Sequence, residues 1–169
     1  MVIYTLKTEL EIHSGTTPKI PHPFLYGNKI HIFNFFRWKG ENVSTTEVEN
    51  VISSVAGLRD VTVYGVEVGN LEGRAGMATI VDPDGQLDLK ILAEEFDKHL
   101  PAYARPLFLR ITDHADMTGT FKLKKIDLQK EGFNPNVIKD KLYFRKGNSE
   151  YVILTKEIYE DIISGKIRV

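Results

Sequence analysis

One stretch of sequence sets both the start and the buried face of a helix, around which the rest of the fold can be predicted. It reads Ser44-Thr45-Thr46-Glu47-Val48-Glu49-Asn50-Val51-Ile52. Serine followed three residues later by glutamate is a capping box, in which the two side chains satisfy free amides at a helix start. Apolar residues then recur at i, i+3, i+4 and i+7, the spacing of one helix face. These residues are Val48, Val51, Ile52 and Val55. The pattern predicts an amphipathic helix that begins at Ser44 and ends at Gly57.

Two strands and a second helix are expected after this helix. Runs of β-branched residues predict strands at 61–66 and 76–81, and the second run ends at the turn sequence Asp82-Pro83-Asp84-Gly85. Asp88 is placed to cap the next helix, which Pro101 must end. The inner face of that helix is Leu89, Leu92, Ala93, Phe96 and Leu100.

The rest of the chain predicts shorter elements. A third strand is expected at 107–111, a short element at 126–129, a helical turn at 135–141 and an extended segment at 151–154. Thr155 is expected to cap a last helix, which Gly165 closes. Its buried side would be Ile158, Tyr159, Ile162 and Ile163. Counting an edge strand that the alternation at 1–11 allows, the order β-α-β-β-α-β followed by a tail predicts an α+β fold: a small sandwich of helices on a short, mostly antiparallel sheet.

Residues 1–32 differ in composition from the rest of the chain. Three prolines fall within 18–23, which disfavours both helix and central strand. We therefore expect residues 1–32 to form a divergent, poorly ordered arm and residues 33–169 to form one domain.

Composition narrows the classes of function. The chain has 169 residues, a net charge of -1 and no cysteine, which argues against disulfides, thiolate catalysis and a nucleic-acid partner. Acidic residues also interrupt the lysines of 122–130. The five histidines lack metal-ligand spacing, so no metal site is expected. No apolar run reaches the roughly 18 residues that read as a membrane span. A soluble intracellular fragment is the expectation.

Three segments carry a resemblance to a known family. They read FRWKGENV at 36–43, YARPLFLR at 103–110 and TGTFKLKK at 118–125. From about Phe36 to its end, the chain resembles the C-terminal domain of very-long-chain acyl-CoA synthetases and fatty acid transport proteins, members of the adenylate-forming, AMP-binding superfamily. The resemblance implies that residues 33–169 are this domain with a family-specific C-terminal extension. It also implies a role in fatty acid uptake and lipid metabolism, and association with the endoplasmic reticulum or plasma membrane.

The resemblance assigns a catalytic role to Lys122. Adenylation joins a carboxylate to the α-phosphate of ATP, and a mobile ammonium can stabilise the negative charge of that transition state. In the family, the TGTFK segment holds the adenylation lysine, so Gly119 and Thr120 are expected next to the nucleotide. Taken without the resemblance, a lysine within the cluster 122–125 is typical of a solvated surface.

The resemblance also singles out the turn at Gly40 and Glu41. In the family, this turn approaches the active site for thioester formation and helps to form the tunnel for the pantetheine arm of CoA. Glycine suits such a place because a bare backbone can approach a ligand closely. The alternative is an ordinary turn ahead of a capped helix. Trp38 is expected to be a packing residue.

Asn34 occupies the position of the family's hinge. Relatives carry Gly-Asp-Thr just before this segment, and the aspartate is the hinge about which the small domain rotates between half-reactions. Here the run reads Phe33-Asn34-Phe35, so the glycine and the aspartate are both missing. Asparagine tolerates the left-handed backbone region, which keeps Asn34 a candidate hinge.

The function implied is the C-terminal lobe of a long- or very-long-chain fatty acid-CoA ligase, which converts ATP, fatty acid and CoA to acyl-CoA, AMP and pyrophosphate. In the family, ATP, Mg²⁺ and the acyl chain are held by a large N-terminal domain whose motifs are not found here. This chain alone is therefore expected to bind no cofactor and to be catalytically silent. The alternative is a stand-alone lobe that acts as a binding or regulatory module on a related synthetase.

Overall fold

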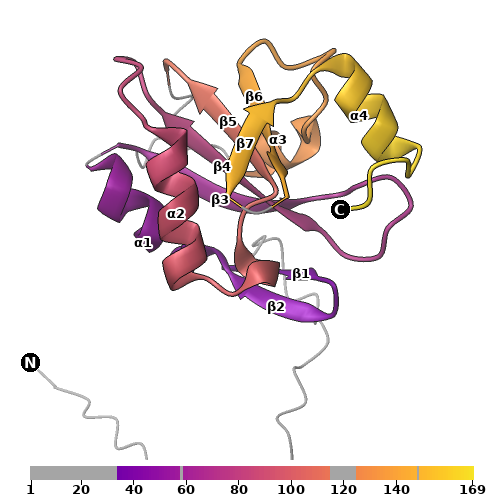
Figure 1. The fold of residues 1–169 in the computed structure, drawn as a ribbon, viewed down its shortest axis with the longest axis horizontal. Coiled ribbons are helices and arrows are strands. Elements are labelled where there is room, and N and C mark those ends of the chain that lie inside the picture. The colour runs from indigo at the N-terminus through magenta and orange to yellow at the C-terminus, as the bar shows by residue number, and fades with distance from the viewer. Residues whose placement is uncertain (1–33, 58, 115–124, 148) are drawn as a thin grey trace, which may run out of the picture. The chain divides into compact units, whose positions relative to one another are not determined.

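The computed structural model describes residues 34–57, 59–114, 125–147 and 149–169. The arm expected over residues 1–32 lies outside these ranges. Within them, a mixed sheet forms the centre of the molecule (Figure 1). Its strands are β3 (Val61–Val66), β4 (Ala75–Val81), β5 (Phe108–Thr112), β6 (Lys141–Lys146) and β7 (Glu150–Ile153).

The strands lie in the order β3-β4-β5-β6-β7, and all neighbours are antiparallel except β4 and β5. The parallel pair is joined by the helix α2 (Leu89–His99), because parallel strands need a crossover connection. The short 3-10 turn η1 (Ala102–Ala104) then leads into β5.

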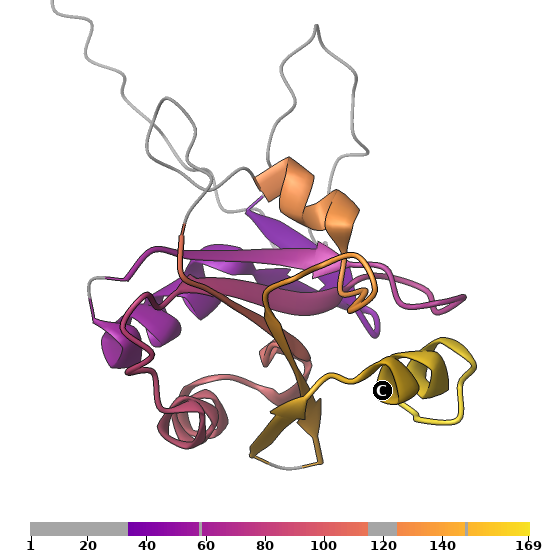
Figure 2. The same ribbon diagram turned by 90° about the horizontal axis from the view of Figure 1, so that it is seen from above.

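Helices cover both faces of the sheet. α1 (Thr45–Ala56) and α2 lie on one face, and α3 (Lys125–Glu131) lies on the other, as the two views show together (Figure 2). α4 (Lys156–Ile163) follows β7. The predicted α+β class, with helices on a mostly antiparallel sheet, is confirmed.

The expected caps of α1 and α2 are present. The Ser44 side chain accepts a hydrogen bond from the Glu47 amide, and Asp88 accepts from the amides of Lys90 and Ile91. The predicted inner faces also hold at their centres, where Val48, Ile52, Leu92, Ala93 and Phe96 are buried.

The segment ahead of α1 is a β-hairpin. β1 (Phe35–Trp38) pairs with β2 (Glu41–Ser44), and Lys39 and Gly40 form the turn with φ of 50° and 85°. Two central residues with positive φ match the tight turn whose twist suits a hairpin. The turn ahead of the helix is therefore present, but the strands on either side of it, β1 and β2, were not expected from the sequence.

The tail contains two further corrections. The helical turn expected at 135–141 is only a turn at 135–137, and Lys141 already begins β6, which pairs with β5 through residues 141–144. In α4 only Ile162 is buried, whereas Ile163 is 42% exposed. The extended segment and the cap at Thr155 are confirmed.

Candidate functional site

The hairpin docks on the sheet through Phe36, which lies across a pair of glycines. Gly65 and Gly76 face each other in the β3–β4 ladder. A Cβ built on Gly65 would lie 2.8 Å from Phe36 Cβ, and one built on Gly76 would lie 2.9 Å from Phe36 Cζ. Because neither glycine has a side chain, the ring can sit directly on the backbone of the two strands, where it is 6% exposed.

A second contact fixes the other side of the hairpin. The Arg74 amide donates to the Arg37 carbonyl at 2.7 Å, and Trp38 forms an isolated bridge with Gly73. Gly73 has a φ of 92°, and a Cβ there would lie 2.7 Å from the Arg37 oxygen. Trp38 is buried in the core, so its prediction as a packing residue is confirmed.

The hairpin turn itself projects from the domain. Gly40 and Glu41 are exposed, and a Cβ on Gly40 would meet no atom within 4 Å. The Lys39 ammonium lies 5.7 Å from the centre of the Trp38 ring. The turn is therefore open to a ligand or to another protein surface, and the cofactor role of Gly40 and Glu41 stays a prediction.

The foot of the hairpin converges on Thr45, which is 1% exposed. Its amide donates to the Asn34 carbonyl at 2.8 Å, and its hydroxyl accepts from Lys125 Nζ at 3.2 Å. Asn34 does not take up the left-handed backbone, because among the described residues Lys39 and Ser149 are the non-glycines with positive φ. Thr45 thus joins the expected hinge position to the first residue of α3.

The far end of α3 is held by Arg110 on β5. The guanidinium donates from Nε to Asp140 at 2.5 Å and from an Nη to Glu131, the last residue of α3. Burial lowers the pKa of Arg110, but the hydrogen bonds to Glu131 and Asp140 outweigh it and raise the pKa above its ordinary value. Tyr64, on β3, is buried in the same sheet. Its hydroxyl and that of Thr79 share a hydrogen bond, and burial raises the pKa of the Tyr64 phenol to about 12.

The segment YARPLFLR is built into the domain. Arg105 donates from Nε to the Leu100 carbonyl and pairs with Asp97, at the end of α2. Asp97 also accepts from Arg145 of β6 at 2.7 Å. These contacts give Arg105 a structural role.

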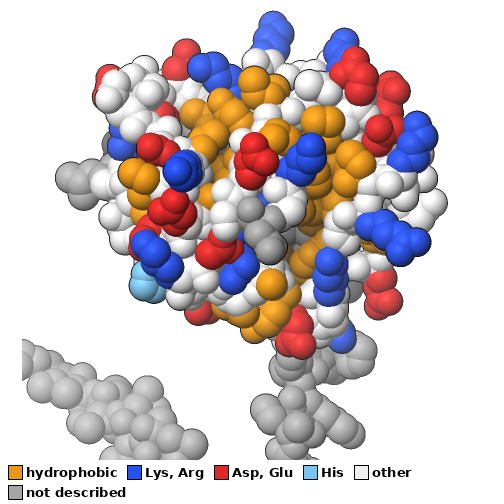
Figure 3. Space-filling view, viewed as in Figure 1, with side chains coloured by type: hydrophobic (Ala, Val, Ile, Leu, Met, Phe, Trp, Pro, Cys, Tyr) orange, Lys and Arg blue, Asp and Glu red, His pale blue; other side chains and the backbone are white. Residues whose placement is uncertain are grey.

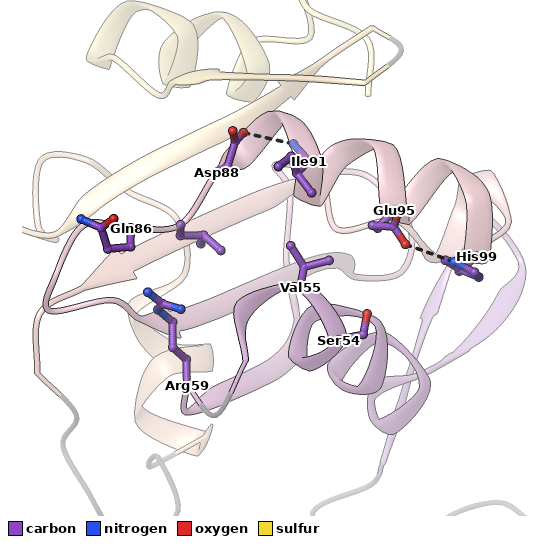
Figure 4. A pocket seen from close by; sticks show the side chains of 9 residues that line it. Ser54, Val55, Arg59, Gln86, Asp88, Ile91, Glu95 and His99 are labelled. Carbon is purple, nitrogen blue, oxygen red and sulfur yellow. Dashed lines mark hydrogen bonds and ion pairs between the residues drawn. The ribbon is translucent and has the colours of Figure 1, made fainter.

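A groove of about 620 Å³ lies between α1 and α2 (Figure 4). None of the predicted site residues lines it. Its ionised side chains have structural partners: Arg59 pairs with Asp82, Asp88 caps α2, and Glu95 pairs with His99. The groove therefore offers no unpaired charge for catalysis.

Asp82 is the buried end of the ion pair beside this groove. Burial raises the pKa of this carboxyl, but hydrogen bonds from the amides of Leu87 and Gln86 and from Arg59 outweigh burial and hold the pKa below its usual value. The carboxylate closes the turn that the sequence predicts after β4.

Two further hollows of about 480 Å³ lie elsewhere. One separates the β3–β4 turn from α4 and the chain's end, and its apolar lining includes Leu71 and Ile163. Hydrophobic side chains gather on the face seen in Figure 3, between β7 and α4. The other hollow lies between Gly65, Arg74 and α3, next to the docked hairpin.

Several predicted site residues lie outside the described part of the chain, namely Gly119, Thr120 and Lys122. Within the described ranges, no group of three or more histidine, aspartate or glutamate residues could hold a metal ion. A search of the same ranges finds no helix with the length and apolar character that crossing a membrane requires.

Comparison with known proteins gives the family of this domain. The AMP-binding enzyme C-terminal domain family matches residues 47–122. Residues 47–122 therefore resemble an AMP-binding enzyme C-terminal domain. The match begins after the hairpin and ends at Lys122, so Asn34, Gly40 and Glu41 lie outside it.

The relatives of this C-terminal domain include long-chain fatty acid transport proteins. The chain is 50% identical over 131 residues to long-chain fatty acid transport protein 1 of Mus musculus, covering 77% of this chain and 20% of the relative. It is 49% identical over 135 residues to long-chain fatty acid transport protein 6 of Homo sapiens, covering 79% and 22%. The chain thus spans about a fifth of the length of these relatives.

A solved fatty acyl CoA synthetase from Mycobacterium tuberculosis shares the fold. It superposes with a TM-score of 0.51 at 25% identity, over 57% of this chain and 19% of that chain. The resemblance stated from the sequence is confirmed by these four matches together.

Sequence reasoning missed the residues that place the hairpin and α3. The glycine pair of β3 and β4 had a signal, since Gly65 and Gly76 interrupt two apolar strands and glycine inside a strand often marks a close backbone approach. Arg110 and Thr45 had none, because their partners lie 30 and 80 residues away in sequence.

Proposed function

We propose that this domain is the C-terminal lobe of a long- or very-long-chain fatty acid-CoA ligase. The observation that carries the proposal is the 50% identity over 131 residues to a long-chain fatty acid transport protein. The likeness in fold to a fatty acyl CoA synthetase adds support. The reaction proposed converts ATP, a fatty acid and CoA to acyl-CoA, AMP and pyrophosphate.

Lys122 is the proposed adenylation residue of this lobe. A positioned ammonium lowers the barrier by stabilising charge that develops between the carboxylate and the α-phosphate. Two observations support the assignment: the family match extends to Lys122, and the helix that begins three residues later is tied to the hairpin foot through Lys125. Gly119 and Thr120 are proposed to flank the nucleotide.

The hairpin turn is proposed to serve the thioester half-reaction. Gly40 and Glu41 would line the path of the pantetheine arm, and the exposure of the turn fits an approach to a second domain. Asn34 is the proposed hinge. Its carbonyl accepts a hydrogen bond from the amide of Thr45, the first residue of α1. Rotation about Asn34 would therefore leave the hairpin attached to α1.

ATP, Mg²⁺ and the fatty acid are proposed to be held by a large N-terminal domain, with CoA bound where the two domains meet. The lobe would then add the lysine and the hairpin but bind no cofactor by itself. The names of the relatives also support a role in fatty acid uptake at the membranes where such proteins act.

A hybrid protein tests the proposal. In it, residues 34–169 replace the matching C-terminal segment of mouse long-chain fatty acid transport protein 1, and the unaltered relative is the positive control. Acyl-CoA formation is measured from a long-chain fatty acid, ATP and CoA. Adenylation is measured alone by pyrophosphate–ATP exchange, and thioester formation alone from preformed acyl-adenylate.

Three variants of the hybrid are compared with it. Lys122→Ala is expected to slow adenylation by about 100- to 1,000-fold, the effect of losing one preorganised electrostatic contact to a transition state. It should leave thioester formation within a few-fold. Lys124→Ala is the matched control from the same lysine cluster and should change neither step. Equal loss in both half-reactions would refute the assignment of Lys122, and an inactive hybrid beside an active parent would refute the proposed lobe.

A further inference from the structure

α3 is held on the sheet by partial burial only, through side chains such as Leu128, which packs against the core. None of its seven residues is buried. The helix ends at Gly132, whose φ is 65°, and the next residue, Phe133, is 4% exposed and stacks on Phe108 with ring centres 4.0 Å apart. The stacked ring fixes where α3 ends. It does not fix the direction of the helix, because a glycine separates the two.

A clamp at the end of α3 supplies that direction. Arg110 lies on the central strand β5, and its side chain is 14% exposed. Asp140 accepts from Nε and so orients the planar guanidinium, whose Nη then reaches Glu131. A lysine could not make both contacts in a fixed plane, because only the arginine fork presents donors in rigid geometry.

A separate contact holds the start of α3. Lys125 donates to the hydroxyl of Thr45, and the amide of the same Thr45 donates to Asn34. The hairpin foot, the hinge position and the first residue of α3 therefore share one nearly buried threonine. The two ends of α3 are therefore held by polar contacts, the start by the buried Thr45 and the end by the mostly buried Arg110.

We propose that Arg110 and Thr45 are positioning residues for adenylation, which they serve by fixing the two ends of α3. This inference rests on the proposed function, since Lys122 lies three residues before α3 in the sequence. Catalytic groups act only within narrow tolerances, and a displacement of about 1 Å caused by a remote mutation can lower a rate by about 100-fold. Arg110 and Thr45 contact no reacting atom. Their effect is to hold the helix that follows the lysine.

The first test measures α3 directly in the full 169-residue chain. Hydrogen exchange of the amides at 125–131 is followed from milliseconds to minutes in Arg110→Gln and Thr45→Val. Exchange is expected to be about tenfold or more faster in both, because local opening governs exchange in weakly buried elements. Arg59→Gln breaks another partly buried arginine–aspartate pair, and Thr46→Val alters the exposed neighbour of Thr45. These matched controls should leave α3 unchanged.

The second test separates the half-reactions in the hybrid protein. Arg110→Gln and Thr45→Val should slow adenylation by about 10- to 100-fold, with thioester formation from acyl-adenylate within about twofold of the parent hybrid. Thr45→Ser keeps the hydroxyl and should restore adenylation. A purely structural role would lower both half-reactions together, as any loss of folded protein does.

The outcomes distinguish the positioning role of Arg110 and Thr45 from the catalytic role of Lys122. Faster α3 exchange with a selective loss of adenylation supports the inference. If Lys122→Ala slows adenylation but Arg110→Gln and Thr45→Val do not, the positioning role is overturned and the proposed function stands. If Lys122→Ala has no effect, the assignment of the lysine fails and the positioning role falls with it. Unchanged α3 exchange in both variants also overturns the positioning role.

Discussion

Replacing Gly65 or Gly76 by alanine adds one methyl group beneath the Phe36 ring and should weaken the docking of the hairpin. The loss of stability should be larger at Gly65 than at Gly76. In Gly65→Ala the new Cβ would lie 2.8 Å from the Cβ atoms of Phe36 and Arg74. Carbon atoms normally pack at about 3.5–4.0 Å, and atoms one bond from the backbone can move only with their strands. Overpacking of this kind costs about 1–3 kcal/mol. Replacing glycine returns about 0.4–1 kcal/mol through the unfolded state, so the net loss is about 1–2 kcal/mol.

Gly76→Ala should cost less. Its Cβ would lie 2.9 Å from Phe36 Cζ, the far end of a side chain that can tilt, and 3.4 Å from Pro106 Cα. The expected net loss is about 0–0.6 kcal/mol, because the lower end of the overpacking range, about 1 kcal/mol, is reduced by the same gain of about 0.4–1 kcal/mol in the unfolded state. The contact atoms also predict different rescue. Phe36→Leu removes Cζ and should relieve Gly76→Ala, but it keeps Cβ and Cγ and should not relieve Gly65→Ala.

Urea unfolding of the 169-residue chain measures these differences. Trp38 is the only tryptophan, and it is buried in the hairpin, so its emission reports hairpin docking within the same titration. Double-mutant cycles between Phe36 and each glycine then give the two coupling energies. Equal coupling at both positions, or wild-type stability and emission in Gly65→Ala, would refute the account of the hairpin as a ring seated on two glycines.

Three further predictions concern single side chains and are checked by urea unfolding. Gly40→Ala should destabilise the chain by about 1 kcal/mol through backbone strain alone, whereas Gly40→Asn should cost less because asparagine tolerates positive φ. Since the pKa of Asp82 is depressed in the folded state, its contribution to stability should be complete above about pH 4 and lost as the pH falls through the folded-state pKa. Wild type and Asp82→Asn should therefore converge in acid. Tyr151→Phe should cost about 1 kcal/mol, because the hydroxyl donates to the Pro106 carbonyl at 2.5 Å.

The helices and most of the sheet could be predicted because their signals are local. A cap and an apolar face lie within a dozen residues of each other, as at Ser44 and Val48, and both were found in the structure. β6 escaped prediction because Lys141-Leu142-Tyr143-Phe144-Arg145-Lys146 has no regular alternation and its burial comes from β5, which is thirty residues earlier. The hairpin was not predicted because each of its strands has only four residues, too few to show an alternating pattern.

In the candidate site too, local sequence signals could be interpreted and long-range contacts could not. Candidate residues, whose roles stay predictions, could be named from the resemblance, since motifs such as that around Lys122 are contiguous in sequence. Placement could not, because it depends on contacts between distant segments: a ring on two glycines, a guanidinium shared by two carboxylates, a hydroxyl reached from eighty residues away. Each needs the folded sheet before it can form.

This difference bears on how a lobe of this kind can vary. The hairpin packs on the sheet through Phe36 and α3 through partly buried side chains such as Leu128, but these contacts alone do not set the placement of either element. Both depend instead on residues of the central sheet, Gly65 and Gly76 for the hairpin and Arg110 for α3. Substitutions at those three sheet positions should therefore alter the placement of the hairpin or of α3 even when the functional motifs are intact. A chain with all of its motifs but an alanine at Gly65 should fold and still present its hairpin wrongly.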